Sequence, residues 1–228
     1  MTQEAKKLAV LIDADNTQLS ALQVIMTELA KYGYIIVKRA YGDWSAPTLK
    51  NWKDSLNELA IQPVQQFSYT QGKNSSDAAM IIDAMDLLYS KKFDAFALIT
   101  SDSDFTKLAS RLKESQIYVF GVGEQKTPLA FRNACDDFIS TEVLRDLDAS
   151  KVVEEPQADS DRAINTAPKN HELRRDARLL NMLRNSLVEY ADDDGWAQLS
   201  NCGGLIKRQF PDFDSRTYGY ASLTKLIE

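Results

Sequence analysis

Cysteine and histidine are scarce in this chain, which contains two cysteines and one histidine among its 228 residues. Cys135 and Cys202 stand far apart and form no CxxC pair, so the sequence offers neither a zinc site nor a disulfide framework. The only histidine, His171, lies beyond the first domain inferred below, which argues against Ser-His-Asp or Cys-His catalysis in that domain. Any catalytic chemistry must use other side chains.

Long hydrophobic runs and an excess of positive charge are also missing. No stretch approaches ~18 uninterrupted apolar residues, and the short apolar run near the start ends in a carboxylate, unlike a signal peptide. We therefore expect a cytoplasmic protein with no membrane partner. Lys and Arg number 27 against 33 Asp and Glu, a formal net charge of −6. Contact with a nucleic acid must then be local, since the surface as a whole is acidic.

The nucleotide-binding glycine motifs are absent as well. Gly121-Val122-Gly123-Glu124 lacks the third glycine of a dinucleotide-binding fingerprint, and no GxxxxGK[ST] sequence occurs. These absences argue against a nucleotide cofactor and against a P-loop enzyme.

The first ~145 residues alternate short β-branched apolar runs with segments of helical period, which predicts an α/β fold built on a Rossmann-like parallel sheet of strand order 3-2-1-4-5. Three local signals agree: Gly33 as the residue after the first helix, Pro47 in a first turn, and Ser76 as a cap for a helix that opens at Asp77. The predicted strands are Leu8–Ile12, Ile35–Ala40, Val64–Tyr69, Ala95–Thr100 and Ile117–Val122, and the predicted helices are Gln18–Tyr32, Thr48–Ala60, Asp77–Ser90, Phe105–Ser115 and Leu129–Ala134.

The character of the sequence changes at about Asp146. Residues 146–170 are polar, contain proline and show no period, which is typical of a linker. Further on, apolar residues recur every three or four positions, and shorter helices are predicted at Gln198–Phe210 and Ala221–Ile227. We predict a domain at 1–145, a linker at 146–170 and a small helical domain at 171–228. The apolar stripe of that domain's first helix comprises Leu173, Ala177, Leu180, Leu183, Leu187 and Tyr190.

Acidic residues stand where predicted strands end. Asp13 follows the first strand, Asp102 follows the fourth, and Asp77 opens the helix after the third. In a doubly wound sheet these positions share one crevice at the carboxyl ends of the strands. Clustered carboxylates normally hold a hard cation such as Mg²⁺ or Mn²⁺, which suits hydrolysis of phosphodiesters or phosphomonoesters. The simpler alternative is that each aspartate caps its own helix.

Two further aspartates follow Asp77 on its helix. Asp83 and Asp86 lie about 240° and 180° around the helix from it, so they are poor ligands for the same ion. We expect Asp86 to be solvated or ion-paired, and Asp83 to support the core or the cluster.

Cations and aromatic residues near the expected crevice suit single-stranded RNA, which presents both phosphates and unstacked bases. Lys73, in a Gly-Lys-Asn loop that opens on the acidic edge, is the expected phosphate contact. Trp44 and Trp52 have a simpler interpretation as packing residues. The candidate set is Lys38, Arg39, Tyr41, Trp44, Lys73 and Arg132, of which Arg39, Lys73 and Arg132 are predicted to bind substrate.

Three blocks, Leu11–Asn16, Gly72–Met85 and Leu98–Phe105, resemble the signature blocks of the NYN domain, a PIN-like nuclease fold. Phe131–Ile139 resembles the closing segment of that family, so the resemblance covers about residues 5–145. The resemblance implies a metal-dependent endoribonuclease whose catalytic, metal-binding residues are Asp13, Asp77, Asp102 and Asp104, with Asn16 and Ser101 as substrate contacts in the same blocks.

The C-terminal region is similar to a LOTUS or OST-type winged helix-turn-helix domain, through Asp194–Ser200 and Phe210–Tyr220. This resemblance implies RNA or a protein as the partner. The sequence stops at Glu228, where that family usually continues into a β-hairpin wing, so we expect the wing to be missing. Candidate phosphate contacts are Lys207, Arg208, Arg216 and Lys225.

Two alternatives to a ribonuclease remain open. Asp13-Ala14-Asp15-Asn16-Thr17 fits the DxDxT motif of haloacid-dehalogenase-type phosphatases, in which the first Asp is a nucleophile. The other motifs of that family, a crevice lysine and a GDxxxD-like segment, are not supplied by Thr100–Asp104. The second alternative is a non-catalytic RNA-binding or regulatory adaptor that keeps the fold.

Overall fold

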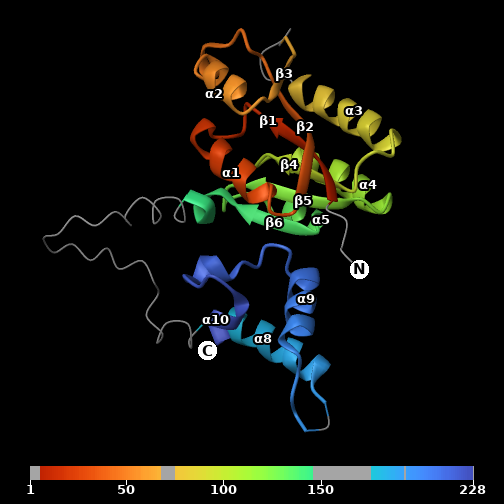
Figure 1. Ribbon diagram of the computed structural model, residues 1–228, viewed down its shortest axis with the longest axis vertical. Helices are drawn as coiled ribbons and strands as arrows, with labels where there is room; N and C mark the ends of the chain where they lie inside the picture. The colour runs from red at the N-terminus through yellow and green to blue at the C-terminus, as the bar shows by residue number, and fades with distance from the viewer. Residues whose placement is uncertain (1–5, 68–74, 146–175, 193, 228) are drawn as a thin grey trace, which may run out of the picture. The chain divides into compact units, whose positions relative to one another are not determined.

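The computed structural model describes residues 6–67, 75–145, 176–192 and 194–227. The chain forms two compact units, Met1–Asp148 and Ala149–Glu228 (Figure 1). Lys73, His171, Leu173 and the whole of the predicted linker at 146–170 lie outside the described residues. No helix within the described ranges is long and apolar enough to cross a membrane.

The first unit is built on a parallel sheet in the order β3-β2-β1-β4-β5-β6. β1 lies at its centre because its run Leu8–Ile12 is apolar at every position, and these residues are 0% exposed. A strand of this kind is stable only where helices cover both faces of the sheet. The strands are β1 (Lys6–Asp13), β2 (Gly33–Gly42), β3 (Gln62–Gln65), β4 (Ala95–Ile99), β5 (Tyr118–Gly123) and β6 (Asp137–Ser140).

Two hydrophobic cores fill the two faces of this sheet, and the side chains of β1 alternate between them. Leu8, Val10 and Ile12 pack in the core under α1 and α2, whereas Ala9 and Leu11 pack in the core under α3, α4 and α5. Figure 1 shows these helix groups on opposite sides of the strands. The helices are α1 (Leu22–Leu29), α2 (Trp52–Glu58), α3 (Ser75–Tyr89), α4 (Thr106–Glu114) and α5 (Leu129–Ala134), with 3₁₀ turns η1 (Leu19–Ala21), η2 (Pro47–Leu49) and η3 (Ser103–Phe105).

The predicted α/β class and the strand order 3-2-1-4-5 are confirmed, and Pro47 opens η2 as expected. The sixth strand was not predicted, because four residues beginning with an aspartate give almost no strand pattern. The residues predicted to end or cap helices agree less well with the structure. Gly33 does not end a helix: α1 stops at Leu29, and Gly33 begins β2, where a Cβ would lie 2.1 Å from the Lys6 carbonyl oxygen. Ser76 lies inside α3 and does not cap it.

The second unit is helical in its described part. Its helices are α8 (Ala177–Tyr190), α9 (Leu199–Gln209) and α10 (Leu223–Ile227), with the 3₁₀ turn η4 (Ser215–Tyr218). The helices were predicted, but the prediction of which face of α8 is buried was wrong. Leu179, Met182 and Ser186 are buried, whereas Leu187 is 47% exposed. Leu179 and Met182 pack in one core with Ile206 and Phe213, which lie far along the sequence and therefore decide which face of α8 is buried.

Candidate active site

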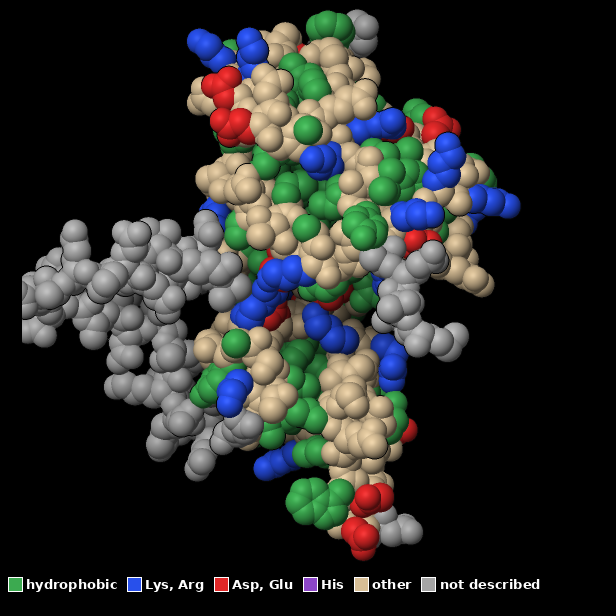
Figure 2. All heavy atoms as spheres, in the orientation of Figure 1, with side chains coloured by type: hydrophobic (Ala, Val, Ile, Leu, Met, Phe, Trp, Pro, Cys, Tyr) green, Lys and Arg blue, Asp and Glu red, His purple; other side chains and the backbone are tan. Residues whose placement is uncertain are grey.

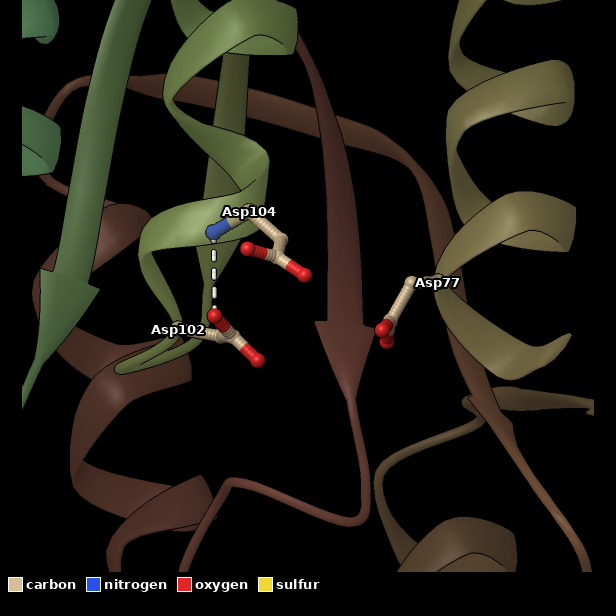
Figure 3. Close-up of side chains that lie close together, drawn as sticks. All are labelled: Asp77, Asp102 and Asp104. Atoms are coloured by element: carbon tan, nitrogen blue, oxygen red, sulfur yellow. Dashed lines mark hydrogen bonds between the residues drawn. The ribbon is translucent and has the colours of Figure 1, made fainter. Parts of the chain in front are cut away.

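Three aspartates converge at the carboxyl ends of the strands. Asp77 is in the first turn of α3, Asp102 follows β4, and Asp104 lies in η3. One carboxylate oxygen of each lies within 4.8 Å of the others, and Figure 3 shows the three side chains pointing toward one another. Opposite ligands of a single Mg²⁺ are about 4.2 Å apart, so this spacing is close to that of an ion site.

Local structure explains the position of two of these carboxylates. Asp102 is the N-cap of η3, and its Oδ1 accepts a hydrogen bond from the backbone N–H of Asp104 at 2.9 Å. The simpler interpretation of Asp102 as a cap is therefore correct for one of its oxygens. The same turn brings Asp104 beside it, so the cap and the candidate ion site are compatible.

Asp13 lies deeper and does not belong to the group of three. It is 1% exposed, and its Oδ2 accepts hydrogen bonds from Thr100 Oγ1 at 2.7 Å and Asn16 Nδ2 at 2.9 Å. Its Oδ1 is buried and has no hydrogen-bond partner among the described residues. A buried carboxylate oxygen without a partner is costly unless a cation satisfies it. Together with three neighbouring carboxylates, this oxygen fits a hard divalent ion.

The electrostatics of the cluster agree with such a site. Burial, together with the negative charges of Asp13, Asp102, Asp104 and Asp15, raises the pKa of Asp77 to about 6. Burial also raises the pKa of Asp13, against the opposing effect of its hydrogen bonds from Thr100 and Asn16. Carboxylates that repel one another in this way gain from a bound cation.

Two residues near the cluster were not predicted as site residues. Thr100 is 1% exposed; its hydroxyl donates to Asp13 and accepts from the backbone N–H of Asp102 at 3.1 Å. It thereby connects the ends of β1 and β4. Asp15 accepts a hydrogen bond from Ser76 Oγ at 3.1 Å, which connects the loop after β1 to the start of α3. The available signal was that Thr100 ends a predicted strand and that Asp15 lies three residues after another.

The predicted substrate contacts have varied surroundings. Asn16 contacts Asp13, while Ser101 Oγ accepts a hydrogen bond from the Glu124 backbone N–H at 3.0 Å. Arg132 Nε donates to the Thr127 carbonyl at 2.7 Å, and its guanidinium lies 5.2 Å from the centre of the Phe138 ring.

Arg39 is bound within the protein. Its guanidinium forms an ion pair with Asp83, and the Tyr41 hydroxyl donates to the same carboxylate. Asp83 therefore supports the packing of α3 on β2, one of the two roles expected for it. Asp86 is exposed.

A parallel sheet with carboxylates at its central strand ends defines a Rossmann-like domain with a candidate cation site. The family model of the NYN domain matches residues 7–147, more than half of the chain, so the chain belongs to the NYN domain family, a PIN-like nuclease family. The model of the OST-HTH/LOTUS domain matches residues 174–228, and this region is such a domain. Both matches confirm the resemblances found in the sequence.

Two proteins of unstated function are similar to this chain. An uncharacterised protein of Methanocaldococcus jannaschii is 27% identical over 174 residues, which cover 70% of this chain and 69% of that protein. The crystal structure of a protein of unknown function from Vibrio parahaemolyticus has a TM-score of 0.51 at 17% identity and covers 61% of this chain and 96% of its own. That likeness concerns the fold alone.

Proposed function

We propose that this protein is a divalent-metal-dependent ribonuclease that hydrolyses phosphodiester bonds within single-stranded RNA. The observation that carries this proposal is the convergence of Asp77, Asp102 and Asp104 within 4.8 Å of one another. NYN domains are typically ribonucleases that depend on divalent metals, and LOTUS domains bind RNA, so both domains support an RNA-directed role.

The proposed roles follow from the geometry. Asp77, Asp102 and Asp104 would hold Mg²⁺ or Mn²⁺, and Asp13 would contribute its unpartnered Oδ1. A bound ion of this kind activates water and neutralises charge on a phosphoryl group. Thr100 keeps the Asp13 carboxylate in one orientation, and the η3 turn fixes Asp102 beside Asp104. Rigid support of this kind aligns the reacting groups before substrate arrives.

The phosphatase alternative is less compatible with the site. An aspartate nucleophile must reach a phosphorus atom with a free oxygen. Asp13 is 1% exposed, and two hydrogen bonds hold its Oδ2. This burial favours a supporting role for Asp13 over nucleophilic attack.

The other alternative, an RNA-binding adaptor without catalysis, meets the same limit on RNA affinity as the ribonuclease. Arg39 and Arg132, both predicted to bind substrate, are engaged by protein groups, and the chain carries a net charge of −6. A site with few available cations near its carboxylates binds phosphates weakly. The experiment below separates the two functions.

The test uses the full chain and an end-labelled single-stranded RNA, with Mg²⁺ or Mn²⁺ against EDTA. We expect cleavage with metal, none with EDTA, and loss of cleavage in Asp77→Asn and Asp102→Asn. Asp86→Asn is the matched control, because Asp86 is an exposed aspartate of the same helix as Asp77. RNA binding without cleavage under every metal condition would contradict the ribonuclease and favour the adaptor. Equal cleavage by all variants would indicate a contaminating nuclease.

A further inference from the structure

A second feature of the NYN domain is a cleft of about 590 Å³ between the η2–α2 segment and β3. We call it the Trp44 cleft. It is open to solvent and combines apolar walls with positive charge. Its lining includes Trp44, Pro47, Leu49, Lys50, Lys53 and Pro63.

Trp44 is held in place at the cleft wall. Its indole N–H donates to the Val64 carbonyl at 3.1 Å, and its ring meets that of Trp52 edge-on, with centres 5.9 Å apart. The two tryptophans differ in exposure: Trp52 is 3% exposed and belongs to the core, whereas Trp44 is partly exposed. A fixed, partly exposed indole is a ready surface on which a planar group stacks at little entropic cost.

Positive charge lies beside this indole. Lys50 and Lys53 are exposed, both line the cleft, and neither forms an ion pair within the described part of the chain. Figure 2 shows Lys and Arg side chains, in blue, at the upper left near α2, with Asp and Glu side chains, in red, just below them. In a protein of net charge −6, two uncommitted lysines on an apolar cleft complement an anionic ligand with an apolar part.

The cleft lies on the same edge of the sheet as the acidic cluster. Gly42, the last residue of β2, separates them: a Cβ there would lie 2.7 Å from Leu49 Cδ1 and 3.8 Å from Asp15 Oδ1. Leu49 lines the cleft, and Asp15 contacts Ser76 next to Asp77. The cleft reaches β3, which is three strands from β4, roughly 14 Å at the spacing of parallel strands. One short stretch of an extended polymer spans this distance.

We propose that the Trp44 cleft is a nucleotide subsite for single-stranded RNA. A base stacks on Trp44, the flanking phosphates contact Lys50 and Lys53, and the strand continues toward Asp77, Asp102 and Asp104. The inference rests on the proposed ribonuclease function and names a part of its substrate site. Single strands fit because only unpaired bases expose their faces, whereas an A-form duplex presents a groove and its backbone.

Binding is measured in EDTA, so that its outcome does not depend on cleavage. A uridine-rich oligonucleotide that contains 4-thiouridine is cross-linked to the full chain, and the adducts are mapped after trypsin digestion. We expect an adduct on the peptide from Ala40 to Lys50, which contains Trp44. Adducts confined to other peptides would overturn the subsite and would favour a peptide as the ligand of the cleft.

Variants test the two parts of the subsite separately. Trp44→Ala should raise the dissociation constant for the oligonucleotide roughly 5- to 100-fold, and Trp44→Phe, which keeps a ring, should restore most of it. Lys53→Glu should raise it several-fold and flatten its salt dependence. Lys92→Glu is the control, because Lys92 is exposed and lies just before β4, at the opposite end of the strands.

Kinetics distinguish this proposal from the function on which it rests. With metal present, the Trp44 and Lys53 variants should raise KM several-fold with kcat nearly unchanged. An unchanged KM alongside active cleavage overturns the subsite alone. Cross-linking at Trp44 without cleavage under any metal condition overturns the ribonuclease and keeps the subsite.

Discussion

At the scale of single residues, the aspartates of the acidic site differ in their hydrogen-bond partners and in the charges around them. Asp13 has one oxygen held by Thr100 and Asn16 and one without a partner among the described residues. Asp102 uses one oxygen as a cap. Asp77 is the most electrostatically perturbed, because it is buried beside four other aspartates. Substitutions in and beside this cluster are therefore expected to have different effects.

Asp77→Asn should stabilise the metal-free protein at neutral pH. The folded state raises the pKa of Asp77 from 3.8 to about 6, so ionising this carboxyl costs folding free energy. The cost is absent well below pH 4, grows between about pH 4 and pH 6, and is constant above that range. After allowance for screening, we expect a gain on the order of 1 kcal/mol at pH 7.5.

Thermal or urea unfolding in EDTA, at pH 7.5 and at a pH below 4, measures this effect. The two proteins should differ at the higher pH and agree at the lower one. A variant less stable than the wild type at pH 7.5 would mean that the Asp77 carboxylate is a structural cap of α3.

Thr100→Val should lower kcat and leave KM nearly unchanged. The substitution keeps the side-chain volume, removes one donor to Asp13 and one acceptor for the Asp102 N–H, and should cost about 1–3 kcal/mol of stability. Thr100→Ser keeps the hydroxyl and is the control. Steady-state kinetics with metal, run well below the unfolding temperature, provide the test; equal kcat values would show that Thr100 has only a packing role.

At the scale of elements, the position of α3 decides where Asp77 lies. The Asp83 carboxylate on this helix accepts hydrogen bonds from the Arg39 guanidinium and the Tyr41 hydroxyl, both on β2. Burial and the hydrogen bond to Asp83 raise the pKa of Tyr41, so the hydroxyl remains a donor at any physiological pH. The interaction fixes both the rotation of α3 and its distance from the sheet.

Asp83→Ala should destabilise the protein by about 2 kcal/mol, because it leaves Arg39 and Tyr41 without their partner in a partly buried site. Asp86→Ala, on an exposed position of the same helix, should change stability by less than about 0.5 kcal/mol. Chemical denaturation compares them. If both variants were equally stable, Asp83 would not hold α3 to β2.

At the scale of the whole molecule, neither half is basic. Residues 1–150 carry 16 basic and 20 acidic side chains, and the remainder carries 11 and 13. RNA affinity must then come from a few positioned cations, with a shallow salt slope of about 0.7 for each phosphate neutralised. Two weak sites on one chain gain from effective concentration when both reach the same strand.

Residues 1–150 alone should retain metal-dependent cleavage but require more RNA than the full chain, which appears as a higher KM with a similar kcat. The two proteins are compared at one salt concentration. Equal KM values would show that the OST-HTH/LOTUS domain does not hold substrate, and would favour a protein as its partner.

Much of the fold and of the candidate site could be predicted from the sequence. The strand order follows from the alternation of strands and helices in a doubly wound sheet. The end of the sheet that carries the site follows from aspartates placed after apolar runs, because parallel strands bring their carboxyl ends together. The buried face of α8 and the short strand β6 were not available. Both depend on partners far along the chain, which local periodicity does not register.

The sequence by itself determined the α/β class, the two domains that the family models match and the aspartates that end the strands, since these depend on local patterns of residue type. Only the tertiary structure separated Asp13 from Asp77, Asp102 and Asp104, and bound Arg39 to Asp83. It also buried Trp52 while leaving Trp44 at a cleft. These outcomes depend on side-chain distances, which the rotation of α3 and the packing of α2 set across the sheet.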